Sequence, residues 1–293
     1  MKITGRTKVF GIFGDPVEHT VSPAMHNSAF EALLLDMVYV PFLVRGTPPP
    51  GGLKGAVEGM RAMNILGMNI TIPHKERVIE YLDWTDEHAS EIGAVNTVVN
   101  RDGTLVGYNT DGAGYMLSLR EETGFIPEGK KAVIVGAGGA ARAILFSILA
   151  GNPRTVVLAN RSVERAKTLA GEFGKKFKGV DIRTSGLDED LVERHAPGAD
   201  LLVNATSLGM TGKEELGISL EGLSGRAIVS DIVYTPLATG LIKKALSRGL
   251  KTHNGLSMLV RQGAITFELW TGRRAPLDVM KKAALAALGG TSP

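Results

Sequence analysis

The chain has 293 residues, of which 44% are hydrophobic and 22% are charged, and its formal net charge at pH 7 is +3. These values are typical of a globular protein with one large or two ordinary domains. With no membrane-length apolar run, no signal-like N-terminus and no basic run with interleaved aromatics, we expect a cytoplasmic protein that binds neither membranes nor nucleic acid. The absence of cysteine excludes disulfides and a thiol nucleophile, and the six scattered histidines offer no metal-ligand cluster.

The N-terminal part of the chain alternates short apolar runs with longer segments that begin at prolines. Such alternation predicts an α/β domain, and the turn Arg101-Asp102-Gly103 predicts a hairpin. Strands are predicted at residues 9–13, 38–42, 67–71, 95–100 and 105–109, helices at 23–36 and 73–83, and a Pro-rich loop at 48–52.

From residue 131 to 254, strands alternate with helices throughout, which predicts a parallel, doubly wound unit. Two helices then follow with no strand between them, at 256–271 and 277–288. We expect these helices to pack back on the first domain. The predicted domains are a substrate domain of residues 1–111 plus 255–293, and an inserted cofactor domain of residues 112–254. Strands of the second domain are predicted at residues 131–135, 155–159, 180–183, 200–204, 227–231 and 250–253.

A glycine-rich loop follows the first strand of this second domain. It contains Gly136, Ala137, Gly138, Gly139 and Ala140, and a predicted helix comes next. Strand, glycine loop and helix form the context that a dinucleotide fingerprint needs, because glycines let the backbone approach a pyrophosphate at a helix N-terminus. A tight turn without a ligand could use the same residues.

The next strand of the domain ends in Asn160-Arg161-Ser162. NAD enzymes commonly place a carboxylate here, on the ribose 2′-hydroxyl. Arg161 and Arg165, one helical turn apart, would instead face a 2′-phosphate, which predicts NADP.

Two hydroxyl residues precede the first predicted helix. Ser22 followed by Pro23 is typical of a helix start, with serine as the N-cap. Thr20 and Ser22 could also hold a small carboxylate at the helix N-terminus. A simple helix cap is the alternative.

The segment 69–75 ends a predicted strand and contains three polar candidates. Asn69 and Thr71 share one strand face. Lys75 is predicted in the first turn of a helix, where the dipole would lower its pKa and favour proton exchange near neutrality. A solvated surface lysine is the alternative.

Further candidates lie at later turns. Asn96 and Asp111 could bind substrate hydroxyls, and Asp111 could hold Lys75; a turn residue and a helix cap are the alternatives. Gln262 lies two turns into a terminal helix, where a glutamine commonly faces solvent.

Taken in order, these segments closely resemble the shikimate dehydrogenase family. The pattern around residues 14–27, Asn69 to Lys75, G-A-V-N-T, N-T-D-G, G-A-G-G-A, N-R-S, N-A-T-S, D-x-x-Y-x-P-L-x-T and G-x-x-M-L-V-x-Q all occur in the family's order. One departure is Thr20, where the family usually has serine. The added methyl predicts preserved carboxylate binding with altered affinity or altered tolerance of ring substituents.

The resemblance implies reversible reduction of 3-dehydroshikimate to shikimate with NADPH, in the route to chorismate and aromatic amino acids. It also implies residue roles. Lys75 would be the general acid/base with Asp111 beside it. Substrate ligands would be Thr20, Ser22, Asn69, Thr71, Asn96, Asp111, Tyr234 and Gln262. Cofactor ligands would be Gly136, Ala137, Gly138, Gly139, Ala140, Asn160, Arg161, Ser162, Arg165, Ile232 and Gly255, with no metal.

Two alternatives remain open from the sequence. One is a quinate/shikimate dehydrogenase with relaxed substrate or cofactor use, and the other is a non-catalytic cofactor-binding regulator. Lys75 together with Asp111 argues against the regulator, because a pure binder needs no proton-transfer lysine. A monomer and a homodimer are both compatible with the sequence.

Overall fold

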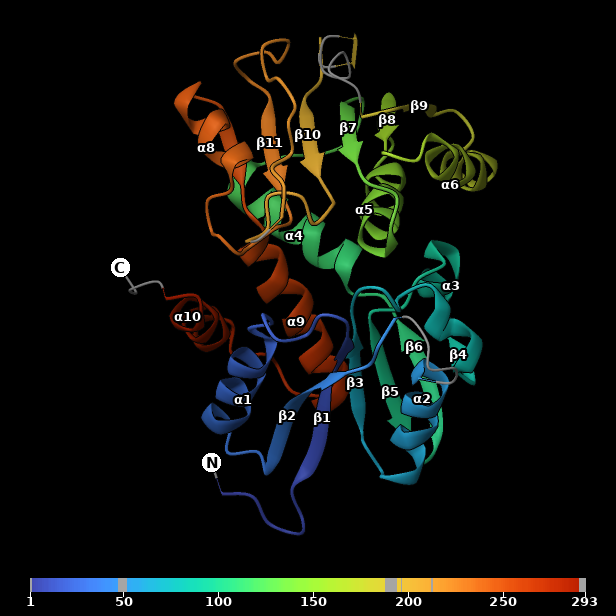
Figure 1. The fold of residues 1–293 in the computed structure, drawn as a ribbon, viewed down its shortest axis with the longest axis vertical. Helices are drawn as coiled ribbons and strands as arrows, with labels where there is room; N and C mark the ends of the chain where they lie inside the picture. The colour runs from blue at the N-terminus through green and yellow to red at the C-terminus, as the bar shows by residue number, and fades with distance from the viewer. Residues whose placement is uncertain (1, 47–51, 188–193, 196, 212, 290–293) are drawn as a thin grey trace. The chain divides into compact units, whose positions relative to one another are not determined.

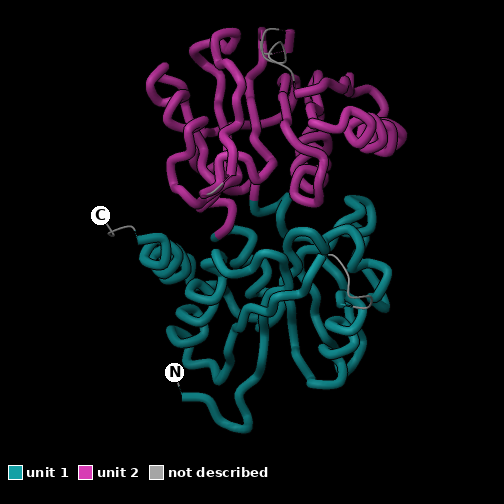
Figure 2. Tube along the Cα trace, in the orientation of Figure 1, with its two compact units in different colours: residues 1–114, 260–293 teal, residues 115–259 magenta. Residues whose placement is uncertain are grey.

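The computed structural model describes residues 2–46, 52–187, 194–195, 197–211 and 213–289. The chain divides into two units, shown in different colours in Figure 2. Unit 1 comprises residues 1–114 and 260–293, and unit 2 comprises residues 115–259. Of the expected loop at 48–52, residues 48–51 lie outside the described residues, and Gly52 begins a helix.

Two helices carry the chain from one unit into the other. They are α4 (Asp111–Thr123) and α9 (Gly255–Thr271). The other elements of unit 1 are β1 (Lys8–Gly14), α1 (Ser22–Ala32), β2 (Met37–Leu43), α2 (Gly52–Ala62), β3 (Gly67–Ile70), the 3₁₀ helix η1 (Arg77–Tyr81), β4 (Trp84–Thr85), α3 (Glu87–Ile92), β5 (Thr97–Arg101), β6 (Thr104–Tyr108) and α10 (Leu277–Ala287).

The described strands of unit 1 form one mixed sheet in the order β2-β1-β3-β5-β6-β4 (Figure 1). β1 and β3 are parallel, whereas β5 is antiparallel to both β3 and β6. β1, β3 and β6 therefore end at one edge of the sheet, which is also where β5 begins. The segments that directly follow β1, β3 and β6, and the segment that directly precedes β5, therefore lie at this edge.

Different side chains cover the two faces of this sheet. On one face, Leu53, Val57 and Met60 of α2 pack against Met68, Ile70 and other buried strand residues. On the other face, α1 packs against α10, and aromatic rings from β1, α1, β2 and α9 form a cluster. The cluster consists of Phe10, His26, Phe30, Tyr39, Phe267 and Trp270.

The described strands of unit 2 form an all-parallel sheet. Its elements are β7 (Lys131–Val135), α5 (Gly139–Ala150), β8 (Thr155–Ala159), α6 (Val163–Lys176), β9 (Asp181–Ser185), β10 (Leu201–Asn204), β11 (Ile228–Asp231), α8 (Gly240–Ser247) and β12 (Lys251–His253). The order β12-β11-β10-β7-β8-β9 is the doubly wound dinucleotide-binding arrangement, in which the chain reverses direction across the sheet at β7. The predicted fold class is confirmed. None of the described helices is both long and apolar enough to cross a membrane.

The helix predicted at 73–83 is wrong. Residues 72–76 form turns, and only the short 3₁₀ helix η1 follows. A tertiary hydrogen bond competes with helix formation here, because the Lys75 carbonyl accepts from Val95 N at 2.8 Å. The His74 side chain is anchored separately, with its ring 2.6 Å from Val44 O. Lys75 is therefore not at a helix N-terminus.

Other elements also differ from their predictions, and α3 and α4 have no counterpart among the predicted helices. The first helix ends at Ala32 rather than residue 36, and Leu34 beyond it adopts a left-handed conformation with φ of 52°. α2 was not predicted, because its glycines lower helix propensity. Leu53, Val57 and Met60, spaced for one helix face, form its buried side.

Gly67 allows β3 to pack directly against α9. A Cβ on Gly67 would lie 2.3 Å from Trp270 Nε1, which donates to Val98 O at 3.1 Å. We predict that Gly67→Ala lowers the free energy of unfolding by about 1–3 kcal/mol through overpacking, measured by urea denaturation.

Gly55→Ala is the matched control. Gly55 lies inside α2, and a Cβ there would have no atom within 4 Å. This change should stabilise the protein by about 0.5–1 kcal/mol through helix propensity. A Gly67→Ala protein as stable as the unmodified chain would contradict the assigned packing.

Candidate active site

A buried ion pair lies at the shared edge of the unit 1 sheet. Lys75, in the turn after β3, donates through Nζ to Oδ2 of Asp111, the first residue of α4. The side chains retain only 14% and 6% of their exposure. Each charge therefore depends on the other, because removing one partner would leave an uncompensated buried charge. The parallel directions of β3 and β6 bring the two residues together.

Asn96, just before β5, holds Asp111 from its other oxygen. Asn96 Nδ2 donates to Asp111 Oδ1 and to Thr110 Oγ1, both at 2.9 Å. The orientation of the amide is fixed, since Thr110 N donates to Asn96 Oδ1 at 2.8 Å. Both carboxylate oxygens of Asp111 thus have defined donors, which gives the carboxylate one orientation.

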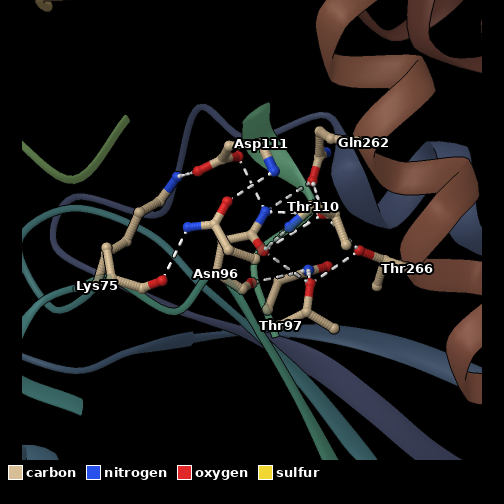
Figure 3. Close-up of polar contacts among 10 residues, drawn as sticks. Lys75, Asn96, Thr97, Thr110, Asp111, Gln262 and Thr266 are labelled. Carbon is tan, nitrogen blue, oxygen red and sulfur yellow. Dashed lines mark hydrogen bonds and ion pairs between the residues drawn. The ribbon is translucent and has the colours of Figure 1, made fainter. Parts of the chain in front are cut away.

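Gln262 and Thr266 bring α9 into the same cluster (Figure 3). Gln262 Oε1 accepts from Asn96 Nδ2 at 3.3 Å and from Thr110 Oγ1 at 3.4 Å. Gln262 is 9% exposed, so the general expectation that a lone glutamine here faces solvent is wrong. Thr266 Oγ1 lies 2.8 Å from Thr97 Oγ1 and 3.1 Å from Thr110 Oγ1.

Asn69 joins this network from the middle of the sheet. Its Nδ2 donates to Asn96 O at 3.1 Å and to Thr97 Oγ1 at 3.2 Å. Its Oδ1 accepts from the Tyr39 hydroxyl at 2.9 Å. Thr71, two residues further on, packs its methyl group against Gly14, where a Cβ would lie only 2.4 Å away.

Thr20 and Ser22 form a separate hydroxyl pair after β1. Thr20 Oγ1 donates to Ser22 Oγ at 3.2 Å and accepts from Ser22 N at 3.3 Å. The prediction that Ser22 is the N-cap is wrong by one residue: Val21 is the N-cap, and its carbonyl accepts from Met25 N at 3.1 Å. Both hydroxyls still lie at the beginning of α1.

The glycine loop of unit 2 follows β7, at the point where the strand order reverses. Gly136 has φ of 123°, and a Cβ there would lie 2.9 Å from Ala205 O, so the position requires glycine. Gly138 caps α5, and a Cβ on it would meet no atom within 4 Å. The loop thus exposes backbone at a helix N-terminus, as a pyrophosphate site requires.

The segment after β8 contacts this loop. Arg165, in α6, donates to the carbonyl of Ala137 at 3.3 Å, and Asn160 Nδ2 donates to Ser162 O at 2.9 Å. Arg161 and Ser162 are exposed. The Arg165 side chain therefore contacts the glycine loop, and Arg161 follows β8, where a carboxylate would favour NAD.

The remaining predicted residues of unit 2 follow β11. A Cβ on Gly255 would lie 2.1 Å from Ile232 O, so the start of α9 packs directly on the backbone after β11. Tyr234 lies two residues after Ile232 and is half-buried. Nearby, Asp231 accepts from Asn204 Nδ2, Val233 N and Thr239 Oγ1, while its burial raises the pKa of the carboxyl to about 6.

Comparison with known proteins identifies the family to which this chain belongs. Family models match residues 12–98 as a shikimate dehydrogenase substrate binding domain, 122–210 as shikimate / quinate 5-dehydrogenase, and 255–285 as a shikimate 5′-dehydrogenase C-terminal domain. A shikimate dehydrogenase (NADP⁺) of Methanopyrus kandleri is 47% identical over 290 residues, which cover 98% of each chain. The chain belongs to the shikimate dehydrogenase family.

Solved structures of shikimate dehydrogenases share the fold over nearly the whole chain. A crystal structure of a shikimate dehydrogenase in complex with NADP⁺ superposes with a TM-score of 0.89 at 43% identity, covering 98% of each chain. The enzyme from Thermus thermophilus, in complex with NADP(H) and shikimate, has a TM-score of 0.82 at 37% identity and covers 96% of this chain and 99% of its own. The family resemblance seen in the motifs is confirmed.

Within this shikimate dehydrogenase fold, hydrogen bonds link Lys75, Asp111, Asn96, Gln262 and Asn69. Thr20 and Ser22 form their own pair, and Tyr234 belongs to unit 2.

The sequence predictions missed four bonded hydroxyls. Thr97 and Thr110 were present inside the quoted motifs, and Thr266 could have been found four residues after Gln262, on the same helix face. Tyr39 carried no comparable signal. Among the described residues, no group of acidic or histidine side chains could hold a metal ion.

His26 supports this network from within the aromatic cluster. Its ring stacks on Tyr39 with centroids 4.6 Å apart, and its two ring nitrogens have no hydrogen-bond partner among the described residues. Full burial lowers the pKa of His26 to about 3. The native protein therefore requires the neutral ring, whereas the unfolded chain protonates it below a pH of about 6.5.

This shift predicts the sign of one pH effect. The stabilising contribution of neutral His26 is complete above pH ~6.5 and is lost as pH falls toward ~3, since the unfolded state binds the extra proton. His26→Phe keeps an aromatic ring but cannot titrate. Between pH 7 and pH 5, its free energy of unfolding should fall by about 2 kcal/mol less than that of the unmodified chain. Urea unfolding at each pH measures this; equal decreases would contradict the assignment.

Proposed function

We propose that the chain catalyses the reversible reduction of 3-dehydroshikimate to shikimate with NADPH, using Lys75 and Asp111 for proton transfer. The observation that carries this proposal is the buried Lys75–Asp111 ion pair, oriented by Asn96 at one edge of the unit 1 sheet. The reaction is inferred from family membership. The ion pair provides the proton donor and acceptor that this reaction needs in addition to the cofactor.

Reduction of a ketone requires a hydride on carbon and a proton on oxygen. NADPH, when bound, supplies the hydride. Lys75 Nζ supplies the proton to the ring oxygen and takes it back in the reverse direction. Asp111 holds the ammonium in position and accepts from a neighbouring substrate hydroxyl. Asn96 keeps this carboxylate from rotating, so that the donor and acceptor are in place before substrate arrives.

Neutral groups suffice for the rest of the substrate. Thr20 and Ser22 would bind the carboxylate, because their hydroxyls lie at the start of α1, where the helix dipole favours an anion. The ring and its other hydroxyls would be held by Asn69, Thr71, Asn96, Tyr234 and Gln262. The functional substrate domain would comprise residues 1–111 and 255–293.

The cofactor would bind to the domain of residues 112–254 and to the adjoining Gly255. The positive φ of Gly136 and the open backbone at Gly138 fit a pyrophosphate held by Gly136 to Ala140. Asn160, Arg161, Ser162 and Arg165 would hold the adenosine ribose and its 2′-phosphate, since guanidinium groups suit a phosphate as a carboxylate does not. Ile232 and Gly255 would line the nicotinamide side.

Quinate is the second candidate substrate, because one matched family model describes shikimate and quinate enzymes together. The Thr20 methyl group is the feature of this chain most able to change tolerance at the ring. A non-catalytic regulator is disfavoured by the retained Lys75–Asp111 pair. A cytoplasmic location and a monomeric or homodimeric state remain predictions.

Steady-state turnover in four pairings tests the proposal. Shikimate and quinate are each oxidised with NADP⁺ and NAD⁺, and reduced cofactor is followed by absorbance. We expect shikimate with NADP⁺ to give the highest kcat/KM, because the arginines favour the phosphorylated cofactor. A preference for quinate or NAD⁺ would contradict the substrate or cofactor assignment, and no turnover in any pairing would favour the regulator.

A further inference from the structure

Thr266 uses its hydroxyl in an unusual way for a threonine inside a helix. Such side chains commonly bond to the carbonyl four residues earlier. The described residues provide three examples: Thr123 donates to Leu119 O at 2.6 Å, Thr168 to Glu164 O at 2.9 Å, and Thr271 to Phe267 O at 2.7 Å. The Thr266 hydroxyl is instead bonded to two other segments of the chain, at Thr97 and Thr110.

The three hydroxyls form a closed, buried set. Thr97 and Thr266 have no exposed surface, and Thr110 retains 2%. The three threonines belong to β5, the start of α4 and the middle of α9, which are far apart in sequence (Figure 3). A buried hydroxyl is costly without a partner, so every hydrogen in this set must point at another hydroxyl of the set or at a neighbouring amide oxygen.

Donor and acceptor roles can be assigned from the fixed groups outward. Asn96 Nδ2 donates to Thr110 Oγ1, and Asn69 Nδ2 donates to Thr97 Oγ1, so both hydroxyls already accept. Thr266 Oγ1 lies between them. It can accept from one of these hydroxyls and donate to the other. The hydroxyl that accepts from Thr266 then donates its own hydrogen to Asn96 Oδ1 or Gln262 Oε1.

We propose that Thr266 is a positioning residue for substrate binding: its hydroxyl sets the orientation of Asn96 and Gln262 without touching substrate. The proposal rests on the proposed function, which makes these two amides substrate ligands. Gln262 lies one helical turn before Thr266 on the same face of α9. Without the Thr266 hydroxyl, the Thr97 and Thr110 hydrogens both turn toward the oxygens of the two amides, and α9 loses one of its polar contacts with β5 and one with Thr110. Asn96 stands between the three hydroxyls and Asp111. The hydroxyls therefore orient the amide groups and do not carry protons to the ion pair.

Two substitutions at Thr266 separate the hydroxyl from the shape of the side chain. Thr266→Val keeps the branched shape and removes the hydroxyl. Thr266→Ser keeps the hydroxyl and removes a methyl group, which leaves a small cavity in the core. The serine variant should therefore lose stability and keep function, and the valine variant should show impaired substrate binding with little loss of stability.

The experiment measures kcat, KM for shikimate, KM for NADP⁺ and Tm of the full chain and its variants. Thr266→Val should raise KM for shikimate about three- to tenfold, the equivalent of one net hydrogen bond, with KM for NADP⁺ unchanged. Thr266→Ser should stay within about twofold of the unmodified chain in KM for shikimate. Thr123→Val is the matched control: it removes a buried threonine hydroxyl whose partners, Leu119 O and Phe125 N, are both local in sequence, and it should leave KM for shikimate unchanged.

Three results would overturn the inference. They are an unchanged KM for shikimate in Thr266→Val, an equal rise in Thr266→Ser, or a parallel rise in KM for NADP⁺. Turnover of shikimate by the unmodified chain is measured in the same assay, so failure of the Thr266 inference is distinguished from failure of the proposed function.

Discussion

The Lys75–Asp111 ion pair is the interaction on which the rest of this structure depends. A buried pair is retained only if its geometry is good and its remaining hydrogen-bonding groups are satisfied, because both charges have left water. Asn96 meets that need at Asp111 Oδ1, while Thr110 N fixes the Asn96 amide. The backbone contributes as well, since Val95 N holds the Lys75 carbonyl and prevents a helix there.

The mixed topology of the first sheet explains why these residues can meet. One antiparallel strand, β5, lies between β3 and β6, so those two strands end at the same edge while β5 begins there. Lys75 and Asn96 lie in connections at that edge, and Asp111 begins α4 there. α9 then adds Gln262 and Thr266, whose contacts tie the C-terminal segment to the sheet. The site is thus assembled from four separate parts of the chain.

Much of this could be predicted from the sequence. Polar residues at strand ends, the glycine loop with its following arginines, and the strand–helix alternation each follow local rules of periodicity and turn chemistry. What failed depended on long-range contacts. The helix predicted around Lys75 is replaced by turns, in which the Lys75 carbonyl accepts from Val95 N. The glycines of α2 lower its helix propensity, so this helix was missed although its buried face stabilises it. Gln262 could be located on a helix, but only the fold shows that it faces Asn96.

The central claim is that Lys75 transfers the proton and does not merely bind substrate. Lys75→Gln tests it most directly, since glutamine can still donate to Asp111 but cannot deliver a proton. The measurement is kcat for shikimate oxidation together with the Kd of shikimate by calorimetry. We expect kcat to fall by about 10²–10⁴-fold with Kd changed only a few-fold. A kcat that is preserved at saturation, with Kd strongly weakened, would mean that Lys75 only binds substrate.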